Sequence, residues 1–290
     1  MTSSGTIVIA SGKGGTGKTT VAVNLAYTAA RLNENVQYLD CDVEEPNGQF
    51  FLKPLISSTR QVCVEVPEVD KDKCTGCGKC GQICQYGAIV CLGGKNVLTF
   101  EQLCHSCGGC MRICPADAIR PRRLEIGRIE TGNSGEIEFV SGTLKIGHVR
   151  TPSMIKEVKK SIKPDAFSII DTAPGTSCAV VETLKGADYV LLVTEPTPFG
   201  LNDLKLAVDL VRKMNLPFAV VINRHGLGNE DAEKYCDAEG IEIAMKLPDD
   251  RRIAEICSTG CLIVDAPGGY GQQFSELYEC VNNVKTRTYD

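Results

Sequence analysis

The glycine-rich segment at residues 11–20, SGKGGTGKTT, constrains the fold of this chain more than any other stretch. An apolar run at residues 6–10 precedes it, and residues 21–26, VAVNLA, continue as a helix. This order of strand, turn and helix fits the pattern G-x-x-x-x-G-K-[ST], in which backbone N–H groups close around phosphate oxygens. The helix N-terminus adds the positive end of its dipole at the same point. The segment therefore predicts a phosphate-binding loop on an α/β sheet.

The residue types in this loop assign the expected contacts. Lys18 is expected to reach the β- and γ-phosphates of a nucleotide, and the Thr19 hydroxyl is expected to hold Mg²⁺. The alternative, a glycine-rich turn that binds no nucleotide, is disfavoured because the strand and the helix are both in place. The expected nucleotide-binding residues of the loop are Gly12, Gly14, Gly15, Thr16, Gly17, Lys18, Thr19 and Thr20.

A second lysine, Lys13, directly follows the first glycine of the loop. With it, the loop resembles K-G-G-x-G-K-[ST], the loop of the deviant phosphate-loop ATPase superfamily that contains MinD, ParA, Mrp and the nitrogenase iron protein. The resemblance implies that the nucleotide is ATP and that two copies of the chain form a homodimer, either permanently or only with ATP. It also implies that Lys13 crosses the interface to the ATP of the other copy, whereas a solvated loop lysine is the alternative.

Two aspartate segments resemble the same superfamily. Residues 40–47 match its segment D-x-D…P-N, which implies that Asp42 positions or activates the attacking water; an acidic turn residue is the alternative. Residues 171–175, DTAPG, resemble its Walker B and switch II segment, which implies that Asp171 holds the Mg²⁺ shell and that Gly175 moves with the γ-phosphate. The catalytic set implied by the resemblance is Lys13, Lys18, Asp42 and Asp171.

Two residues at the ends of later strands are expected to contact the base of the nucleotide. Residues 218–224, FAVVINR, resemble the segment V-V-N-[RK] of the superfamily, which implies that Asn223 pairs with the adenine edge. The alternative for this asparagine is a turn at the end of a strand. Pro248, in the segment Leu247-Pro248-Asp249, matches the loop that walls the purine in the superfamily.

Sixteen cysteines indicate metal ligands rather than disulfides, because the expected compartment is reducing. Residues 74–84 and 104–115 each carry the spacing C-x2-C-x2-C-x3-C, and a proline ends the second run. In bacterial ferredoxins the first three cysteines of such a run bind one [4Fe–4S] cluster and the fourth ligates the other. Zinc in paired C-x2-C knuckles is the alternative. The predicted ligand sets are Cys74, Cys77, Cys80 and Cys114 for one cluster, and Cys104, Cys107, Cys110 and Cys84 for the other.

Three further cysteines raise separate questions. Cys178 lies seven residues after Asp171, an offset that resembles the switch II cysteine of the nitrogenase iron protein, which ligates a [4Fe–4S] cluster between two subunits. This resemblance makes Cys178 a candidate extra cluster or metal ligand, and a buried small side chain is the alternative. Cys257 and Cys261 form a C-x3-C pair near the end of a helix and are expected to be structural, with a redox or metal-binding pair as the alternative.

The spacing of apolar segments predicts a two-part architecture. Strands alternate with helices in residues 1–58 and 142–290, which predicts a doubly wound, mostly parallel α/β sheet. Residues 59–141 are predicted to be an inserted, small ferredoxin-like α+β domain, with a return linker or hairpin after about residue 120. The final helix, residues 272–284, is expected to dock on the core through Phe274, Leu277, Tyr278 and Val281.

Charge and hydropathy exclude several functions. The net charge is −5, with acidic and basic residues interspersed, so neither a nucleic-acid-binding tail nor a polybasic membrane patch is indicated. No apolar stretch reaches the roughly 18 residues of a membrane span, and the chain runs directly into its first strand. We therefore expect a cytoplasmic protein that neither inserts into membranes nor binds nucleic acid.

Together these motifs favour an ATPase that is also an iron–sulfur protein. The resemblance implies that nucleotide state is coupled to low-potential electron transfer, or to the assembly and transfer of metalloclusters, with an acceptor protein as the partner. One alternative is a positioning or regulatory switch like ParA and MinD, whose clusters sense redox state. Another is an electron-transfer ferredoxin in which the ATPase half only docks a partner.

Overall fold

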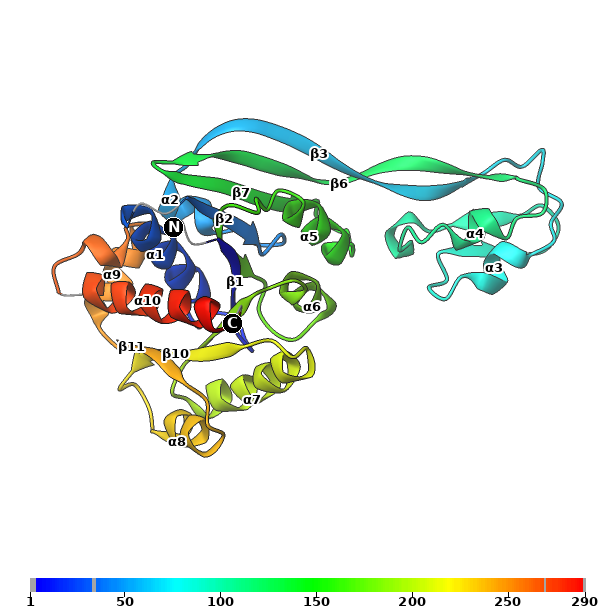
Figure 1. Cartoon of the computed structure of the whole chain (residues 1–290). Helices are drawn as coiled ribbons and strands as arrows, with labels where there is room; N and C mark the ends of the chain where they lie inside the picture. Colours follow the sequence, from blue (N-terminus) through cyan, green and yellow to red (C-terminus); the bar gives the residue numbers. More distant parts are fainter. Residues whose placement is uncertain (1–3, 33–34, 269, 289–290) are drawn as a thin grey trace.

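One nine-stranded sheet forms the body of the computed structural model, which describes residues 4–32, 35–268 and 270–288 (Figure 1). Its strands are β1 (Gly5–Ala10), β2 (Val36–Cys41), β3 (Leu55–Val69), β6 (Ile119–Ser134), β7 (Ile137–Leu144), β8 (Phe167–Thr172), β9 (Tyr189–Thr194), β10 (Phe218–His225) and β11 (Ile243–Pro248). The strand order is β11-β10-β9-β1-β8-β2-β7-β6-β3. Neighbouring strands from β11 to β7 are parallel, whereas β6 runs antiparallel to both β7 and β3.

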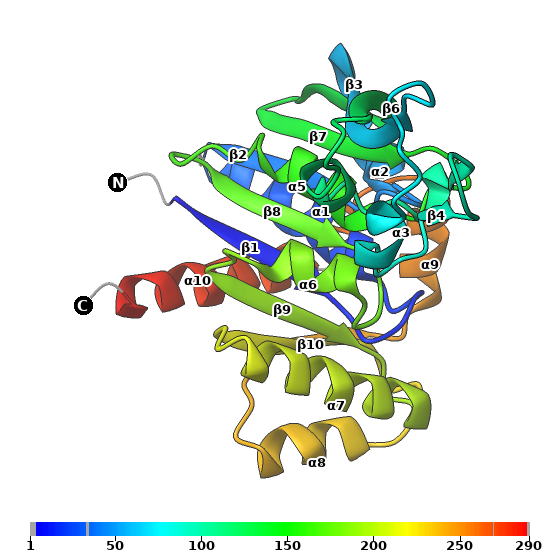
Figure 2. The same ribbon diagram turned by 90° about the vertical axis from the view of Figure 1, so that its right-hand side faces the viewer.

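Helices cover both faces of the sheet (Figures 1 and 2). Those that pack on one face are α1 (Lys18–Arg31) and α10 (Tyr270–Thr288), and those on the other are α5 (Thr151–Lys159), α6 (Cys178–Leu184) and α7 (Pro198–Lys213). Successive residues of a strand point to opposite faces, so Ile7 of β1 enters the first core and Val8 the second. Strands buried on both faces read as continuous apolar runs. The predicted doubly wound, mostly parallel sheet is confirmed.

A long two-stranded ribbon connects the sheet to a small module (Figure 1). β3 and β6 pair from Leu55↔Asn133 at the sheet to Val69↔Ile119 at the module. Only residues 127–134 of β6 also pair with β7, so the rest of the ribbon continues beyond the sheet. The chain then turns between β6 and β7, where Gly135 has a φ of 57°.

This ribbon changes the expected boundaries of the insert. Residues 120–141 were expected as a return linker or hairpin, and they form β6 together with the first part of β7. The expected boundary at residues 141 and 142 falls inside β7, which pairs with β2 through Val36↔Ile137 to Asp40↔Ser141. The return hairpin therefore belongs to the large sheet, because its second strand extends the parallel part of that sheet.

The module at the end of the ribbon, residues 70–118, repeats one small motif twice. Its elements are α3 (Lys79–Ile83), β4 (Ile89–Cys91), β5 (Val97–Thr99) and α4 (Gly109–Arg112). Each short helix follows a left-handed glycine, Gly78 with a φ of 72° before α3 and Gly108 with a φ of 71° before α4. A side chain disfavours that conformation, which explains why glycine stands at the same place in both cysteine runs.

The last helix contributes to the core as expected. Phe274, Leu277, Tyr278 and Val281 are buried and pack with α1 and the sheet, so the predicted docking of this helix is confirmed. Within the three ranges that the structure describes, no helix combines the length and the apolar character that a membrane span requires.

We predict that Phe274→Ala lowers the free energy of unfolding by about 3–5 kcal/mol, because it leaves a cavity under a fully buried ring. Urea denaturation followed by far-UV circular dichroism measures the change. The matched control is Phe199→Ala, whose ring is on a residue 79% exposed and which should change stability by less than about 0.5 kcal/mol. Equal losses in the two variants would contradict the placement of α10.

Candidate nucleotide and cysteine sites

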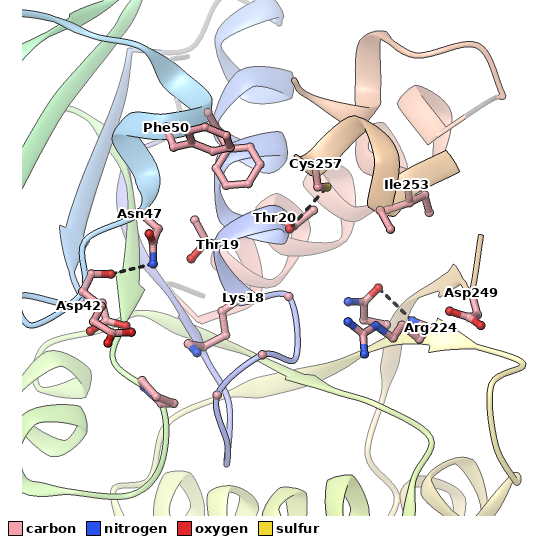
Figure 3. A pocket seen from close by; sticks show the side chains of 18 of the residues that line it. Lys18, Thr19, Thr20, Asp42, Asn47, Phe50, Arg224, Asp249, Ile253 and Cys257 are labelled. Carbon is pink, nitrogen blue, oxygen red and sulfur yellow. Dashed lines mark hydrogen bonds between the residues drawn. The ribbon is translucent and has the colours of Figure 1, made fainter. Parts of the chain in front are cut away.

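A pocket of about 510 Å³ opens where the parallel strands end. Figure 3 shows Lys18, Thr19 and Thr20 at the start of α1 on one side of it, and Asp42 after β2. Arg224, at the end of β10, and α9 (Arg251–Ser258) close it from the other direction. Open α/β sheets bind ligands outside the carboxyl ends of their strands. The pocket therefore has the position and the loop that a nucleotide requires.

The loop before α1 places Lys18 under the pocket. Lys18 is the first residue of α1, and its side chain is buried. Burial lowers the pKa of its ammonium group, and the carboxylates of Asp171 and Asp42 oppose that shift. Gly17 has a φ of 93°, and a Cβ there would lie 2.3 Å from Nδ2 of Asn223. Only glycine suits both this conformation and this close approach.

One carboxylate oxygen of Asp171, at the end of β8, accepts hydrogen bonds from two hydroxyl groups. The hydroxyl of Thr19 donates to its Oδ2 at 2.6 Å, and the hydroxyl of Tyr38 donates to the same atom at 3.2 Å. Its Oδ1 is buried and has no hydrogen-bond partner among the described residues. Burial raises the pKa of Asp171 to about 6, although the hydrogen bonds from the two hydroxyl groups and the charge of Lys18 lower it. A free carboxylate oxygen beside a threonine hydroxyl is a donor set that suits Mg²⁺.

The two aspartates after β2 have different surroundings. Asp40 is buried, and its two oxygens accept from the backbone N–H groups of Asp42 and Gly48, at 3.2 and 2.9 Å. Asp40 therefore stabilises the backbone of the loop that follows β2. Asp42 lines the pocket instead, and burial, followed by the charge of Asp171, raises its pKa to about 6. Of the pair, Asp42 alone reaches the ligand space.

Lys13 is held within its own chain. Its Nζ lies 2.9 Å from Oε2 of Glu195, and Nη1 of Arg224 lies 2.9 Å from Oε1 of the same carboxylate. The Glu195 side chain is only 6% exposed. The sequence reasoning missed Glu195, although its place directly after β9, at the carboxyl edge of the sheet, was a usable signal.

The remaining predicted nucleotide contacts lie around the loop. Asn223 and Pro248 both line the pocket. Nδ2 of Asn223 donates to the carbonyl of Thr16 at 2.8 Å, so this amide supports the loop, and its adenine contact stays a prediction. The N–H of Gly175 donates to the carbonyl of Ser11 at 2.9 Å, which joins the segment after β8 to the loop. Gly12 lies outside the pocket, against the backbone of Asp203.

Several pocket residues had no sequence motif to mark them. Phe50 and Ile253 add apolar surface, and Figure 3 shows both at the rim. The thiol of Cys257 lies 3.9 Å from the hydroxyl of Thr20, and burial raises its pKa. Cys257 therefore belongs to the pocket wall, whereas Cys261 is exposed. Ile253 and Cys257 reach the pocket from α9 and Phe50 from α2 (Gly48–Leu52), and local sequence does not reveal how these two helices pack.

The eight motif cysteines gather around two separate cavities of the module. Each cavity combines three cysteines of one run with the fourth cysteine of the other. One cavity is lined by Cys74, Cys77, Cys80 and Cys114, together with apolar residues such as Val69 and Ile119. The other, of about 270 Å³, is lined by Cys84, Cys104, Cys107 and Cys110. The structure thus brings together the same two sets that the spacing predicts.

Backbone N–H groups point at sulfur atoms in both sets. The N–H of Gly76 donates to Sγ of Cys74 at 3.4 Å, and the N–H of Ser106 donates to Sγ of Cys104 at the same distance. The N–H of Lys79 is the main cause of a lowered pKa at Cys77. Such donors stabilise thiolates, which are the form of cysteine that ligates iron.

Cys178 lies apart from both sets. It begins α6, is exposed, and lines a wide cavity of about 880 Å³ with Asp42, His105 and Arg150. Across residues 4–32, 35–268 and 270–288, no three histidine, cysteine, aspartate or glutamate side chains gather closely enough to hold a single metal ion. A role for Cys178 as a ligand stays a prediction.

Comparisons with known proteins agree with this architecture. Residues 7–263 match the family model described as the CobQ/CobB/MinD/ParA nucleotide-binding domain. An uncharacterised protein of Methanocaldococcus jannaschii is 33% identical over 88% of this chain and 89% of its own length. A protein of Pyrococcus horikoshii named iron–sulfur cluster carrier protein is 26% identical over 96% of this chain and 86% of its own length.

A solved structure shows the same fold. The septum site-determining protein MinD of Pyrococcus horikoshii, solved with Mg-ADP, superposes with a TM-score of 0.61 at 21% identity, over 98% of each chain. The family match spans most of the chain, and the structure places the glycine-rich loop before α1 and the Asp42 carboxylate around one pocket. The chain therefore belongs to the CobQ/CobB/MinD/ParA family of nucleotide-binding proteins and is a P-loop ATPase.

Proposed function

We propose that this ATPase carries two [4Fe–4S] clusters in the module and that its nucleotide state controls electron transfer through them to a partner protein. The observation that supports this most is the crossed arrangement of the eight cysteines around two cavities. A crossed set makes each run depend on the other, so the clusters would be permanent parts of the module rather than loosely held cargo. The proposal places the protein in the cytoplasm, where free thiols stay reduced.

In the proposed ATP site, each polar group has a separate task. Thr19 and Asp171 would hold Mg²⁺, which would supply positive charge to the phosphates. Lys18 adds a buried cation to the same phosphates. Asp42 faces the pocket, where it would orient the attacking water. We propose that Asn223 and Pro248 contact the base, since both line the same pocket.

The proposed homodimer gives Lys13 a second position. Lys13 is held by the buried carboxylate of Glu195, so reaching the nucleotide of another copy requires breaking that ion pair. Gly175 donates to the loop that carries Lys13, which supports a link between the segment after β8 and this lysine. We propose that ATP, rather than ADP, favours the released position, because its γ-phosphate adds negative charge at the interface.

A second candidate function is the transfer of iron–sulfur clusters to an acceptor protein. Several relatives, from Pyrococcus and Aquifex aeolicus among others, carry the name iron–sulfur cluster carrier protein. In this chain the exposed Cys178 is the residue that suits such a role, since it opens onto a wide cavity beside Asp42. A membrane-positioning switch is less well supported, because the apolar face of α10 is buried against the core.

We predict that iron binding and ATP hydrolysis can each be lost by mutation without loss of the other. Anaerobically reconstituted protein should bind about eight iron atoms per chain, and Cys77→Ser or Cys107→Ser should each lose about half of them. Thr19→Ala should lower ATP hydrolysis by about 100-fold or more while retaining the iron, because it removes a group from the proposed Mg²⁺ site alone. Iron analysis and phosphate release measure the two properties.

The conservative control is Thr19→Ser, which keeps the hydroxyl group and should keep most of the activity. Iron in Cys178→Ser should equal that of the unchanged protein if Cys178 is outside both sets. Zinc in place of iron after anaerobic purification, or about four iron atoms in the unchanged chain, would count against the proposal.

We also predict that Asp42→Asn makes the protein more stable and less active. The folded-state pKa of about 6 lies above the unfolded value, so Asp42 binds its proton more tightly when folded. Stability from this group is therefore present at low pH and is lost as pH rises from about 4 to about 6. At about pH 8, the variant should gain roughly 2 kcal/mol, a figure that allows for partial exposure to solvent.

Thermal denaturation in EDTA, without nucleotide, measures this gain, which should shrink as pH falls towards about 5. ATP hydrolysis by the same variant should fall by about 100-fold or more, because the amide does not accept a proton from water. Glu136→Gln, on an exposed carboxylate in the turn between β6 and β7, is the control and should alter neither property. A destabilised Asp42→Asn protein would argue against the buried-carboxylate explanation.

A further inference from the structure

A buried arginine joins the cysteine module to the body of the ATPase. Arg150 directly precedes α5, and the whole residue is 3% exposed. Its Nε donates to the carbonyl of Cys104 at 2.7 Å, and its Nη2 donates to the carbonyl of Glu101. Its Nη1 lies 3.3 Å from Nδ1 of His148. One guanidinium group of the body thus holds the loop that begins the second cysteine run.

The charge of this guanidinium group is not balanced by an ion pair in the part of the chain that the structure describes. Within the described residues, Arg150 has no carboxylate at ion-pair distance, and its acceptors on the module are backbone carbonyls. A guanidinium group stays protonated in proteins, and a buried charge without a counter-charge is costly. Cys104 lines the second cavity, so an anionic group bound there would be held by the residue whose carbonyl accepts from this cation. A cluster held by four thiolates is such a group.

The next residue connects the same point to the nucleotide site. The hydroxyl of Thr151 donates to Oε1 of Glu44 at 2.8 Å. Glu44 lies two residues after Asp42, which lines the nucleotide pocket. The loop that carries Asp42 and the loop of the second cysteine run are therefore fastened to two consecutive residues, Arg150 and Thr151.

The first cysteine set lacks this connection. Neither cysteine cavity is lined by a residue of the ATPase body, but the first, which includes Val69 and Ile119, shares no residue with the wide cavity that reaches Asp42. The second cavity shares His105 with the wide cavity that also reaches Asp42 and Cys178. The two sets thus differ in what surrounds them, although their cysteine spacing is the same.

From this difference we infer that the cluster held by Cys84, Cys104, Cys107 and Cys110 is the one that responds to nucleotide, through Arg150 and Thr151. Arg150 is a positioning residue: it fixes the Cys104 loop and places a positive charge beside the cluster, which favours the reduced state. Thr151 transmits movement of the loop that carries Asp42. This inference rests on the proposed function, since it requires the two clusters.

The first test is an anaerobic redox titration of both clusters, followed by EPR, in the full-length protein. Arg150→Met should make reduction of the second cluster at least tenfold less favourable, which is about 59 mV for a one-electron couple, and should leave the first cluster unchanged. Arg150→Lys keeps the charge and should keep most of the potential. Arg128→Met is the matched control, because it removes the same charge from an exposed site on the ribbon.

The second test repeats the titration with ADP and with a non-hydrolysable ATP analogue. The unchanged protein should show a nucleotide-dependent shift at the second cluster alone. Thr151→Val keeps the shape of the side chain but removes its hydroxyl, so the shift should disappear while iron content and nucleotide binding are retained. Glu44→Gln keeps an acceptor oxygen for Thr151 and should preserve the shift.

The outcomes separate this inference from the function on which it depends. Fewer than about eight iron atoms in the unchanged chain would defeat the proposed function itself. If the protein holds full iron but nucleotide shifts the potentials of both clusters equally, the inference alone is overturned. It is also overturned if Arg150→Met leaves the potential of the second cluster unchanged. If Arg150→Met loses iron, Thr151→Val still decides the question, because the hydroxyl that it removes bonds to Glu44 of the ATPase body. A full nucleotide-dependent shift in that variant rules out the connection. Signals are assigned with Cys77→Ser and Cys107→Ser.

Discussion

The hydrogen bond from Thr19 to Asp171 is the contact on which the nucleotide site depends. It joins the start of α1 to the end of β8 at 2.6 Å, and it does so beside another buried carboxylate. Asp40 of β2 is the register partner of Asp171 in β8, so the two carboxylates lie next to each other. Burial and this proximity raise the pKa of Asp40 well above its usual value. The two adjacent carboxylates therefore lack a balancing positive charge in the absence of ligand, and the proposed Mg²⁺ would supply that charge.

The ribbon explains how a chain of this family accommodates an inserted module. The insertion begins and ends in two paired antiparallel strands, so hydrogen-bonded strands rather than long loops join the module to the sheet. At about 3.3 Å for each residue, the 15 residues of β3 span about 50 Å. A ribbon of that length bends easily unless something holds its far end. Arg150 provides that hold, because it fastens the Cys104 loop of the module to the start of α5, where Thr151 fastens the Asp42 loop.

Sequence motifs were sufficient where chemistry depends on local spacing. The phosphate loop and the two cysteine sets follow from residues close together in the chain, and the structure brings both predicted groups together. Tyr38, Glu195 and Arg150 were not predicted, because each acts through a partner more than 40 residues away. Tyr38 looked like an ordinary core residue of a strand, and only the register of β2 against β8 aims its hydroxyl at Asp171. Arg150 stood in a stretch without a motif.

The pairing of Glu195 with two cations bears on how Lys13 could move. A buried carboxylate that loses its only partner is left with an uncompensated charge, which costs several kcal/mol. Glu195 has two partners, so Arg224 remains 2.9 Å from its Oε1 when Lys13 leaves Oε2. Release of Lys13 is therefore less costly than the breaking of an isolated buried ion pair. Arg224 also lines the nucleotide pocket, so a bound nucleotide is well placed to change how firmly Arg224 holds Glu195, and hence how easily Lys13 departs.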